Sequence, residues 1–530
     1  MNKKTIKVAA VTLAVATGLA VVAGCTSSSS SSSGSGGAPT KITMLVLGDK
    51  PTNGRYQAML DVLNPRLTQQ VNATLDFYYV EWADWQTQYN TELLSGDSNI
   101  DLITTATDWL FAWDNAKKGA FLPLSQDMLQ QNAPKTWAQV QSKGDWDVCT
   151  MNDQIWFMPE DNYTQHTNQG FFYRGEWAKQ AGIPTVDGKV DGLNMIQNME
   201  QFTQYFQWVK ANQPQAYPWD AGQYNESVLD GYLQGHTDKN TILALTTGNY
   251  YPFQTKLSDP YTITSWFMDG DELLDAANLA KQWNDMGVWR ADAINFAGDT
   301  DYSEFYSGLS GTGQHHTETF VTQTVYNMNL KQPGSDPQFF YWGEENGNVY
   351  NDLKTHGAMA VSANSKNPDL ALKVYDLLRN DQTDYMLLNY GIEGTDYVID
   401  SDGKLTYPAN YDPTTDALGT NFWAGRMDEF EPVKTTDAPN LKEIYSQLET
   451  QTKDYPYETL IFDTDSIQPE LTAIASALGN YLPQLAYGQF DDPASAISKM
   501  RADVKAAGWD DAVASLQKDM DTWAQANGLK

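Results

Sequence analysis

The sequence predicts an α/β fold, in which crossover helices connect the strands of a sheet, and three observations support this. Short apolar runs typical of strands occur at Lys41–Leu47, Leu75–Tyr79 and Asp101–Thr104, with helical segments between them. The strand-and-helix pattern restarts at Gly170–Arg174 and again at Gly357–Ser362. The third observation is length, because 530 residues are enough for two large lobes that each bury a core.

The helices are predicted from apolar residues that recur at helical spacing. The first helix lies between the first two strands, and Pro65 is expected to bend or divide it. The second helix is expected to carry Trp82 and Trp85 on one face, so packing is the favoured role for both rings. Three helices are expected to close the chain, with apolar faces at Leu471–Tyr481, Ile497–Val504 and Val513–Trp523.

The N-terminal segment Met1–Cys25 has the order of a secretory signal, with a basic end, an apolar core and small residues. A cysteine directly after small residues resembles the lipobox of bacterial lipoproteins, which implies that Cys25 carries lipid and becomes the mature N-terminus. Val22 departs from the leucine that is usual at its position. The alternative is an ordinary cleaved signal with a coincidental cysteine. Residues 26–39 are rich in Ser and Gly and predict a flexible tether.

The composition limits the classes of ligand that the protein is expected to bind, and it indicates which interactions stabilise the fold. The formal net charge of −33 argues against nucleic acid and against an anionic membrane surface as partners, so a neutral ligand such as a sugar fits best. The 17 Trp and 29 Tyr residues also fit a sugar ligand. Only Cys149 remains once Cys25 is lipid-linked, so the core rather than disulfides is expected to hold the fold.

Several motifs together resemble the extracellular solute-binding lipoproteins of ABC sugar importers. Trp82–Asn90 and Lys118–Leu124 are similar to parts of the N-terminal lobe in that family. Ala358–Ala371 looks like the strand, turn and helix at the return crossover. Leu387–Tyr397 resembles a larger subgroup with an extra C-terminal helical domain. Each motif is weak alone, but their order and spacing extend the resemblance from Lys41 to Asn527.

The resemblance implies a two-lobed, periplasmic-binding-protein-like fold of type II, with a hinge between the lobes and extra C-terminal helices. Residues 40–163 with 358–425 are expected to form the N-terminal lobe, and residues 164–357 with 426–530 the C-terminal lobe. The implied function is capture of an oligosaccharide in the cleft and its delivery to the transmembrane subunits of an ABC permease. The implied protein is a monomer, anchored by lipid to the extracellular face of the cell membrane, without cofactor or metal.

Candidate ligand-binding residues are those that combine an aromatic ring with polar neighbours, because a sugar offers apolar C–H faces and many hydroxyls. Asp108 and Trp109 follow a strand, where open α/β sheets bind ligands. Trp109, Trp342 and Trp423 stand in polar loops and are predicted platforms for a sugar ring. The full set is Asp108, Trp109, Glu160, Asn162, Tyr163, Trp219, Trp266, Trp342, Glu344, Tyr390, Glu393, Trp423 and Arg426.

For each tryptophan the alternative is packing inside the fold, and this alternative is favoured for Trp219 and Trp266. Catalytic patterns are absent from the sequence: there is no Gly-x-Ser-x-Gly, no His-Glu-x-x-His and no phosphate-binding glycine loop. The adjacent pair His315-His316 is a poor metal site, and Asp299–Ser303 lacks the glycine and closing glutamate of a calcium loop. A secreted glycoside hydrolase and a surface adhesin or structural lipoprotein remain as alternative functions.

Overall fold

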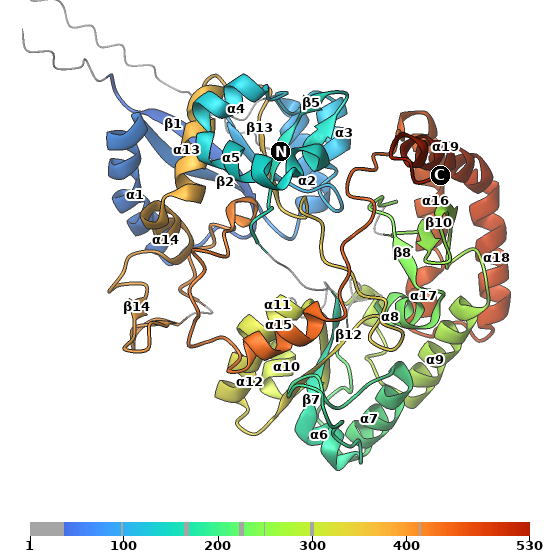
Figure 1. Cartoon of the computed structure of the whole chain (residues 1–530). Coiled ribbons are helices and arrows are strands. Elements are labelled where there is room, and N and C mark those ends of the chain that lie inside the picture. Colours follow the sequence, from blue (N-terminus) through green and yellow to red (C-terminus); the bar gives the residue numbers. More distant parts are fainter. Residues whose placement is uncertain are drawn as a thin grey trace, which may run out of the picture. The chain divides into compact units, whose positions relative to one another are not determined.

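In the computed structural model, a five-stranded sheet organises the N-terminal part of the chain (Figure 1). β1 (Thr40–Leu47) pairs in parallel with β2 (Ala73–Val80) and with β3 (Leu102–Thr105). β13 (Ala358–Val361) enters from far along the chain and is antiparallel to both β3 and β6 (Phe157–Pro159). The strand order is β2-β1-β3-β13-β6. The strand-and-helix pattern predicted from residues 41–104 is confirmed in this sheet.

Helices contribute to the cores on both faces of this sheet. These helices are α1 (Arg55–Val71), α2 (Trp85–Ser95), α3 (Ala112–Lys117), α4 (Gln126–Asn132), α5 (Pro134–Lys143), α13 (Pro368–Asn380) and α14 (Gln382–Tyr390). Met44 and Val46 of β1 share a core cluster with residues of α1 and α13. Leu45 and Leu47 share another cluster with residues of α2 and α3. Successive side chains of a strand point to opposite faces of the sheet. Because helices cover both faces here, both sets of side chains are apolar.

The structure contradicts the division of the first helix at Pro65 and the placement of Trp82 on the second helix. Pro65 lies inside α1 without dividing it. The buried residues Leu60, Leu63 and Leu67 continue the packed face across the proline, and this packing outweighs the missing backbone hydrogen bond. Trp82 lies outside α2, because the chain makes a turn after β2 and the helix begins only at Trp85.

A second sheet has β7 (Gly170–Arg174) at its centre, antiparallel to β11 (Thr312–His315) and to β12 (Pro337–Tyr341). A third sheet has the order β10-β9-β8, with bounds Asp259–Thr264, Gln254–Lys256 and Asn240–Ile242. The helices of this part are α6 (Gly175–Gln180), α7 (Met199–Asn212), α8 (Ser227–His236), α9 (Glu272–Met286), α10 (Ser303–Ser307), α11 (Thr317–Thr319), α12 (Val325–Lys331) and α15 (Leu441–Glu449). Two short hairpins pair β4 (Thr150–Met151) with β5 (Gln154–Ile155), and β14 (Val398–Ile399) with β15 (Leu405–Thr406).

The chain closes with α16 (Gln468–Gly479), α17 (Leu482–Ala486), α18 (Pro493–Ala506) and α19 (Trp509–Ala526). These are four helices rather than the three predicted, because the chain turns after Gly479 and a separate short helix begins at Leu482, with Pro483 in its first turn. Ile474, Met500 and Leu516 of this segment share one core cluster with Trp283 of α9. The C-terminal helices are thus joined to the part that contains α7, α8 and α9.

The structure describes residues 37–96, 99–163, 169–221, 227–247, 250–296, 302–412 and 415–530. The predicted signal segment with Cys25, most of the tether and the Asp299–Asp301 portion of the rejected calcium loop lie outside these residues. Within them, Thr40–Lys530 belongs to one compact unit, and Cys149 is a buried free thiol. No helix in the described residues has both the length and the apolar character needed to cross a membrane.

Candidate functional site

Three tryptophan rings gather at the ends of the parallel strands in the first sheet. Trp82 follows β2, Trp109 follows β3, and Trp423 begins the short helix η4 (Trp423–Gly425). The ring centroids of Trp82 and Trp423 are 5.9 Å apart, with 27° between the ring planes. The centroids of Trp82 and Trp109 are 6.4 Å apart. The aromatic cluster therefore occupies the carboxyl ends of parallel strands, where open α/β sheets bind ligands.

A hydrogen bond from the Asn421 side chain to the backbone of β1 holds the segment that carries Trp423 against the end of that strand. Asn421 Nδ2 donates a hydrogen bond to the carbonyl oxygen of Leu47 at 2.7 Å. A Cβ atom on Gly48 would collide with this amide, and Gly48 has a φ of 138°, which suits glycine. Trp423 is thereby placed beside Trp82, which is 43% exposed. The cluster thus offers accessible aromatic surface on which the apolar face of a ligand could stack.

An ion pair lies beside Trp109. Asp108 Oδ2 is 2.7 Å from His356 Nδ1, and Trp109 Nε1 donates to the carbonyl oxygen of His356 at 3.0 Å. Burial lowers the pKa of His356, but the Asp108 carboxylate outweighs burial and raises the pKa to about 10. The imidazole is therefore protonated at neutral pH. Asp108 Oδ1 and Asp352 Oδ2 are buried without a hydrogen-bond partner among the described residues, so acceptors remain available here.

The stability contributed by the Asp108–His356 pair should depend on pH. Because the pKa of His356 in the folded chain is about 10 and its ordinary value is 6.5, this contribution is complete below pH 6.5 and is lost as the pH rises towards 10. We expect the difference in melting temperature between the wild type and His356→Gln to shrink steadily from pH 6.5 to pH 10. Thermal melts followed by circular dichroism measure this difference, and a constant difference over that range would contradict a protonated His356.

Arg426 is the centre of a charged hub that joins the first sheet to the second. Its Nε donates to Glu160, which directly follows β6 of the first sheet. Its Nη1 donates to Glu318 Oε1 at 3.1 Å, and Glu318 lies in α11, directly after β11 of the second sheet. Tyr163 OH donates to the same oxygen of Glu318 at 2.7 Å. The Arg426 guanidinium also lies 3.7 Å from the centroid of the Tyr163 ring.

The two carboxylates of the hub differ in their environments. Burial is the largest single effect on Glu318 and opposes its ionisation, but Arg426, His316, Lys434 and the hydrogen bond from Tyr163 together outweigh it and lower the pKa of Glu318 to about 2. Burial dominates at Glu160 and raises its pKa above the usual range, although Arg426 donates to it. The side chain of Glu160 is only 4% exposed, so its charge depends on Arg426 for compensation. The hub therefore combines one firmly ionised carboxylate with one that is costly to ionise.

The structure brings six predicted residues into two neighbouring groups. Asp108, Trp109 and Trp423 belong to the aromatic cluster and its ion pair, and Glu160, Tyr163 and Arg426 belong to the hub. The two groups meet in the chain at η4, because Trp423 and Arg426 are three residues apart. We therefore take the aromatic cluster, the Asp108–His356 pair and the hub together as the candidate site.

Three predicted tryptophans lie in a core cluster instead. Trp219, Trp266 and Trp342 are 2%, 3% and 7% exposed and share this cluster with helices α7 and α9. The expectation that Trp342 stands free in a polar loop is wrong, because its ring packs near Phe171 with the centroids 5.9 Å apart. The burial of Trp219 and Trp266 agrees with the packing role that the sequence favours for both.

The remaining predicted residues are not joined to the aromatic cluster or the hub. Glu393 is exposed in the loop after α14. The other three are engaged by polar partners of their own: Glu344 by Lys189, Asn162 by Lys143 at 2.6 Å, and Tyr390 by Glu431. Burial raises the pKa of Glu344 to about 7, against the opposing effect of Lys189. These contacts engage one carboxylate oxygen of Glu344, the amide oxygen of Asn162 and the hydroxyl of Tyr390, whereas Glu344 Oε2 is buried without a hydrogen-bond partner among the described residues.

Sequence reasoning missed Trp82, Glu318, His356 and Asp352. Trp82 could have been found from Asp84, because an aspartate directly before a helical run is a start signal that leaves Trp82 outside the helix. No local sequence pattern marks Glu318 or His356 as a site residue. Their roles come from partners that are 108 and 248 residues away, Arg426 and Asp108.

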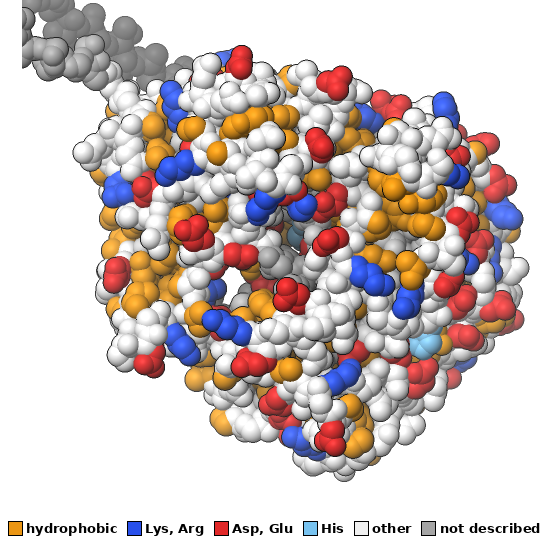
Figure 2. Space-filling view, in the orientation of Figure 1, with side chains coloured by type: hydrophobic (Ala, Val, Ile, Leu, Met, Phe, Trp, Pro, Cys, Tyr) orange, Lys and Arg blue, Asp and Glu red, His pale blue; other side chains and the backbone are white. Residues whose placement is uncertain are grey.

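Two cavities are lined in part by chain neighbours of candidate-site residues, such as Thr107 beside Asp108 and Met427 beside Arg426. One of about 170 Å³ is lined by Thr107 and Phe111 from the loop after β3 and by Tyr457 and Leu471 from the C-terminal segment. A second of about 410 Å³ is lined by polar and charged side chains, including Asn162. Figure 2 shows a face of the molecule that is hollowed near its centre, with Asp, Glu, Lys and Arg side chains around the hollow.

The chain is similar over most of its length to a curated protein and to several solved structures. A protein-family model described as a domain of unknown function, DUF3502, matches residues 456–525. A carbohydrate ABC transporter substrate-binding protein of Streptococcus pneumoniae serotype 4 (strain ATCC BAA-334 / TIGR4) is 22% identical over 542 residues. That alignment covers 98% of this chain and 98% of the relative, so the similarity extends over the whole length of both proteins.

Solved structures share the fold at lower identity. The N-glycan transport solute binding protein NgtS from Streptococcus pneumoniae, in complex with Man1GlcNAc, has a TM-score of 0.69 and 19% identity, covering 92% of this chain and 100% of that chain. The S. pneumoniae substrate binding protein FusA in complex with kestose has a TM-score of 0.62, 14% identity and coverage of 92% and 100%. An HMO binding solute binding protein from Bifidobacterium longum infantis ATCC 15697 has a TM-score of 0.60, 17% identity and coverage of 92% and 99%.

Proposed function

We propose that this chain captures an oligosaccharide outside the cell and delivers it to an ABC transporter permease. Its fold is the two-lobed α/β fold of the solute-binding proteins of ABC sugar importers. The observation that carries the proposal is the aromatic cluster of Trp82, Trp109 and Trp423 beside the hub centred on Arg426. In the proposed arrangement, residues 40–163 with 358–425 form one lobe and residues 164–357 with 426–530 form the other.

The chemistry of the candidate site suits a neutral sugar. Tryptophan rings stack on the C–H faces of a pyranose, and ionised side chains make strong hydrogen bonds with its hydroxyls. Asp108 Oδ1 and Asp352 Oδ2 are unpaired acceptors that sugar hydroxyls could satisfy. An anionic glycan fits less well, because Asp108, Asp352, Glu160 and Glu318 place more carboxylates here than Arg426 and His356 can neutralise.

The relatives support the ligand class. The curated relative is named for carbohydrate, and the similar solved structures are named for complexes with Man1GlcNAc and kestose and for HMO binding. These ligands belong to those proteins, and we propose only the shared class, an oligosaccharide, for this chain. We also propose that it acts as a binding protein rather than as an enzyme, since no finding favours a glycoside hydrolase or an adhesin.

The deciding experiment is binding calorimetry of the full mature chain against plant, milk and starch oligosaccharides, with chromatography of each mixture afterwards. We expect saturable binding of at least one sugar and recovery of that sugar unchanged. Shortened sugars in the mixture would identify a hydrolase instead. No binding to any member of the panel at millimolar concentration would contradict capture of an oligosaccharide and favour the adhesin.

We further propose that Cys25 is the lipid-anchored residue that holds the protein at the cell membrane. Cys25→Ser should release the protein into the medium or leave an uncut precursor, because the thiol is the atom to which lipid is attached. Cell fractionation and the mass of the product measure this result. Cys149→Ser is the control, since it changes the other cysteine, a buried free thiol, and should leave the protein in the membrane fraction. Unchanged retention and processing of Cys25→Ser would disprove the anchor.

A further inference from the structure

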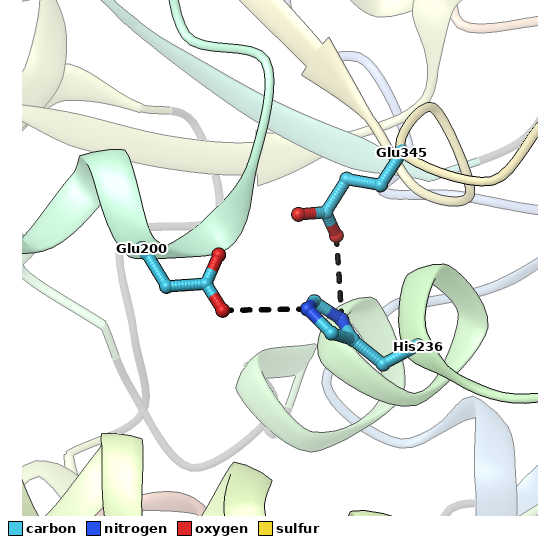
Figure 3. Close-up of side chains that lie close together, drawn as sticks. All are labelled: Glu200, His236 and Glu345. Carbon is cyan, nitrogen blue, oxygen red and sulfur yellow. Dashed lines mark ion pairs between the residues drawn. The ribbon is translucent and has the colours of Figure 1, made fainter.

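Three side chains with metal-binding atoms that do not belong to the candidate site converge on one another, as Figure 3 shows. Glu200 lies in the first turn of α7, His236 ends α8, and Glu345 lies in the loop after β12. One ring nitrogen of His236 and one oxygen from each carboxylate all lie within 4.8 Å of one another. His236 Nε2 is 3.4 Å from Glu200 Oε1, and His236 Nδ1 is 3.3 Å from Glu345 Oε2.

The hydrogen bonds of His236 determine which of its nitrogens is free. Nδ1 lies 2.9 Å from the carbonyl oxygen of Tyr232 as well as close to Glu345, so Nδ1 carries a proton and donates it. A neutral imidazole then directs the lone pair of Nε2 towards the Glu200 carboxylate. Two electron-rich atoms facing each other at 3.4 Å need a positive charge between them, which is either a proton or a metal ion.

Glu345 contributes a largely buried carboxylate to the cluster. Its side chain is 11% exposed, and its Oε1 accepts a hydrogen bond from the backbone N–H of Met199 at 3.1 Å. Its Oε2 is buried and has no hydrogen-bond partner among the described residues. This oxygen lies 3.3 Å from His236 Nδ1, and it keeps a lone pair that a metal ion could use.

We propose that Glu200, His236 and Glu345 bind one divalent transition-metal ion, with Zn²⁺ as the best-matched ion. One imidazole and two carboxylates form a donor set that suits zinc, whereas all-oxygen sites suit calcium or magnesium. Two ligand atoms about 2.1 Å from one tetrahedral zinc ion are about 3.4 Å apart, which is the separation of His236 Nε2 from Glu200 Oε1. The Nδ1–H bond to Tyr232 orients the ring as the outer partners of metal-bound histidines do.

The ion would act as a structural clip within one lobe, because it would tie α7, α8 and the loop after β12 together. Glu200 has a side chain that is 60% exposed, so the site is open to solvent and water can complete the coordination. This inference does not depend on the proposed sugar, since none of the three residues belongs to the candidate site.

The test is calorimetric titration of Zn²⁺ into the full mature chain, prepared without a polyhistidine tag and freed of metal with a chelator. We expect saturable binding of about one ion per chain, weakened at least ~10-fold in His236→Gln and in Glu200→Gln. Glu200→Gln is the safer variant, because an exposed side chain contributes little to folding. Glu443→Gln removes an exposed carboxylate of α15 outside the cluster and should bind zinc as the wild type does.

A second measurement separates a structural ion from a loosely bound one. Zinc should raise the melting temperature of the wild type and of Glu443→Gln, and it should raise that of Glu200→Gln much less, because only the folded site binds the ion. The inference is overturned if zinc does not bind, or if it binds equally tightly to the wild type and to both cluster variants. It is also overturned if calcium alone binds and His236→Gln does not weaken it. In each of these cases a protonated His236 between two carboxylates accounts for the cluster.

Discussion

Alanine at Trp82 or Trp423 is expected to weaken oligosaccharide binding at least tenfold while the melting temperature of the ligand-free protein changes little. Stacking on a pyranose buries apolar area worth roughly 25 cal/mol per Å², so the loss of one ring costs on the order of 2 kcal/mol of binding free energy. Trp82 is 43% exposed and stacks on Trp423, so its removal opens little of the core. Calorimetry with the best sugar of the panel measures the affinity.

Trp342→Ala is the matched control for this experiment. The same side chain is removed, but Trp342 is 7% exposed and packs in the core near Phe171. We expect a clear fall in the melting temperature, with affinity retained in the folded fraction, because large-to-small changes in a core cost about 3–5 kcal/mol of folding free energy. If Trp82→Ala and Trp423→Ala behave like Trp342→Ala, these rings are part of the core and the proposed site is wrong.

Arg379→Met is expected to produce the largest loss of stability. Arg379 Nη2 donates to Asp161, and the side chains of both residues are 0% exposed. Arg379 Nη1 also donates to the carbonyl oxygen of Pro159 at 3.0 Å, at the end of β6. Removing the guanidinium leaves a buried carboxylate with reduced compensation, which costs about 3–5 kcal/mol of folding free energy. Chemical denaturation with urea measures the loss.

Lys41→Met is the control for a cation at the surface. Lys41 pairs with Asp76, the two side chains are 60% and 45% exposed, and such pairs contribute less than about 1 kcal/mol. The double variant Arg379→Met with Asp161→Leu should recover part of the stability, because it removes the uncompensated charge together with its partner. If the double variant is no more stable than Arg379→Met, packing by the arginine rather than its charge maintains this region.

The first sheet could be predicted because its strands are buried on both faces and therefore appear as short apolar runs. The helices α1 and α13 could be predicted for the same kind of reason, since each buries one periodic face. The strand order could not be predicted. β13 lies between β3 and β6 because of pairings such as Ala360 with Ile103, and no local pattern encodes a pairing between segments so far apart.

The candidate site could be predicted only in part, because several of its residues are brought together only by folding. Asp108 and Trp109 were found because they follow a strand, and the end of a strand places them at a defined edge of the sheet. Trp82 was missed because a spacing of three residues from Trp85 is also the spacing of a buried helix face. Glu318 was missed because its significance depends on Arg426, which approaches it only in the folded chain.

The insertion of β13 into the first sheet has a consequence for how the protein matures. Ala358, where β13 begins, comes 199 residues after Pro159, where β6 ends (358 − 159), so a chain emerging N-terminus first presents β3 and β6 long before the strand that joins them. Until then the facing edges of β3 and β6 keep unpaired backbone groups and can recruit strands of other chains. The N-terminal sheet therefore closes only after most of the intervening elements, β7 and β12 among them, have been made. A nascent fragment that ends before Ala358 therefore exposes strand edges that the complete chain pairs with β13.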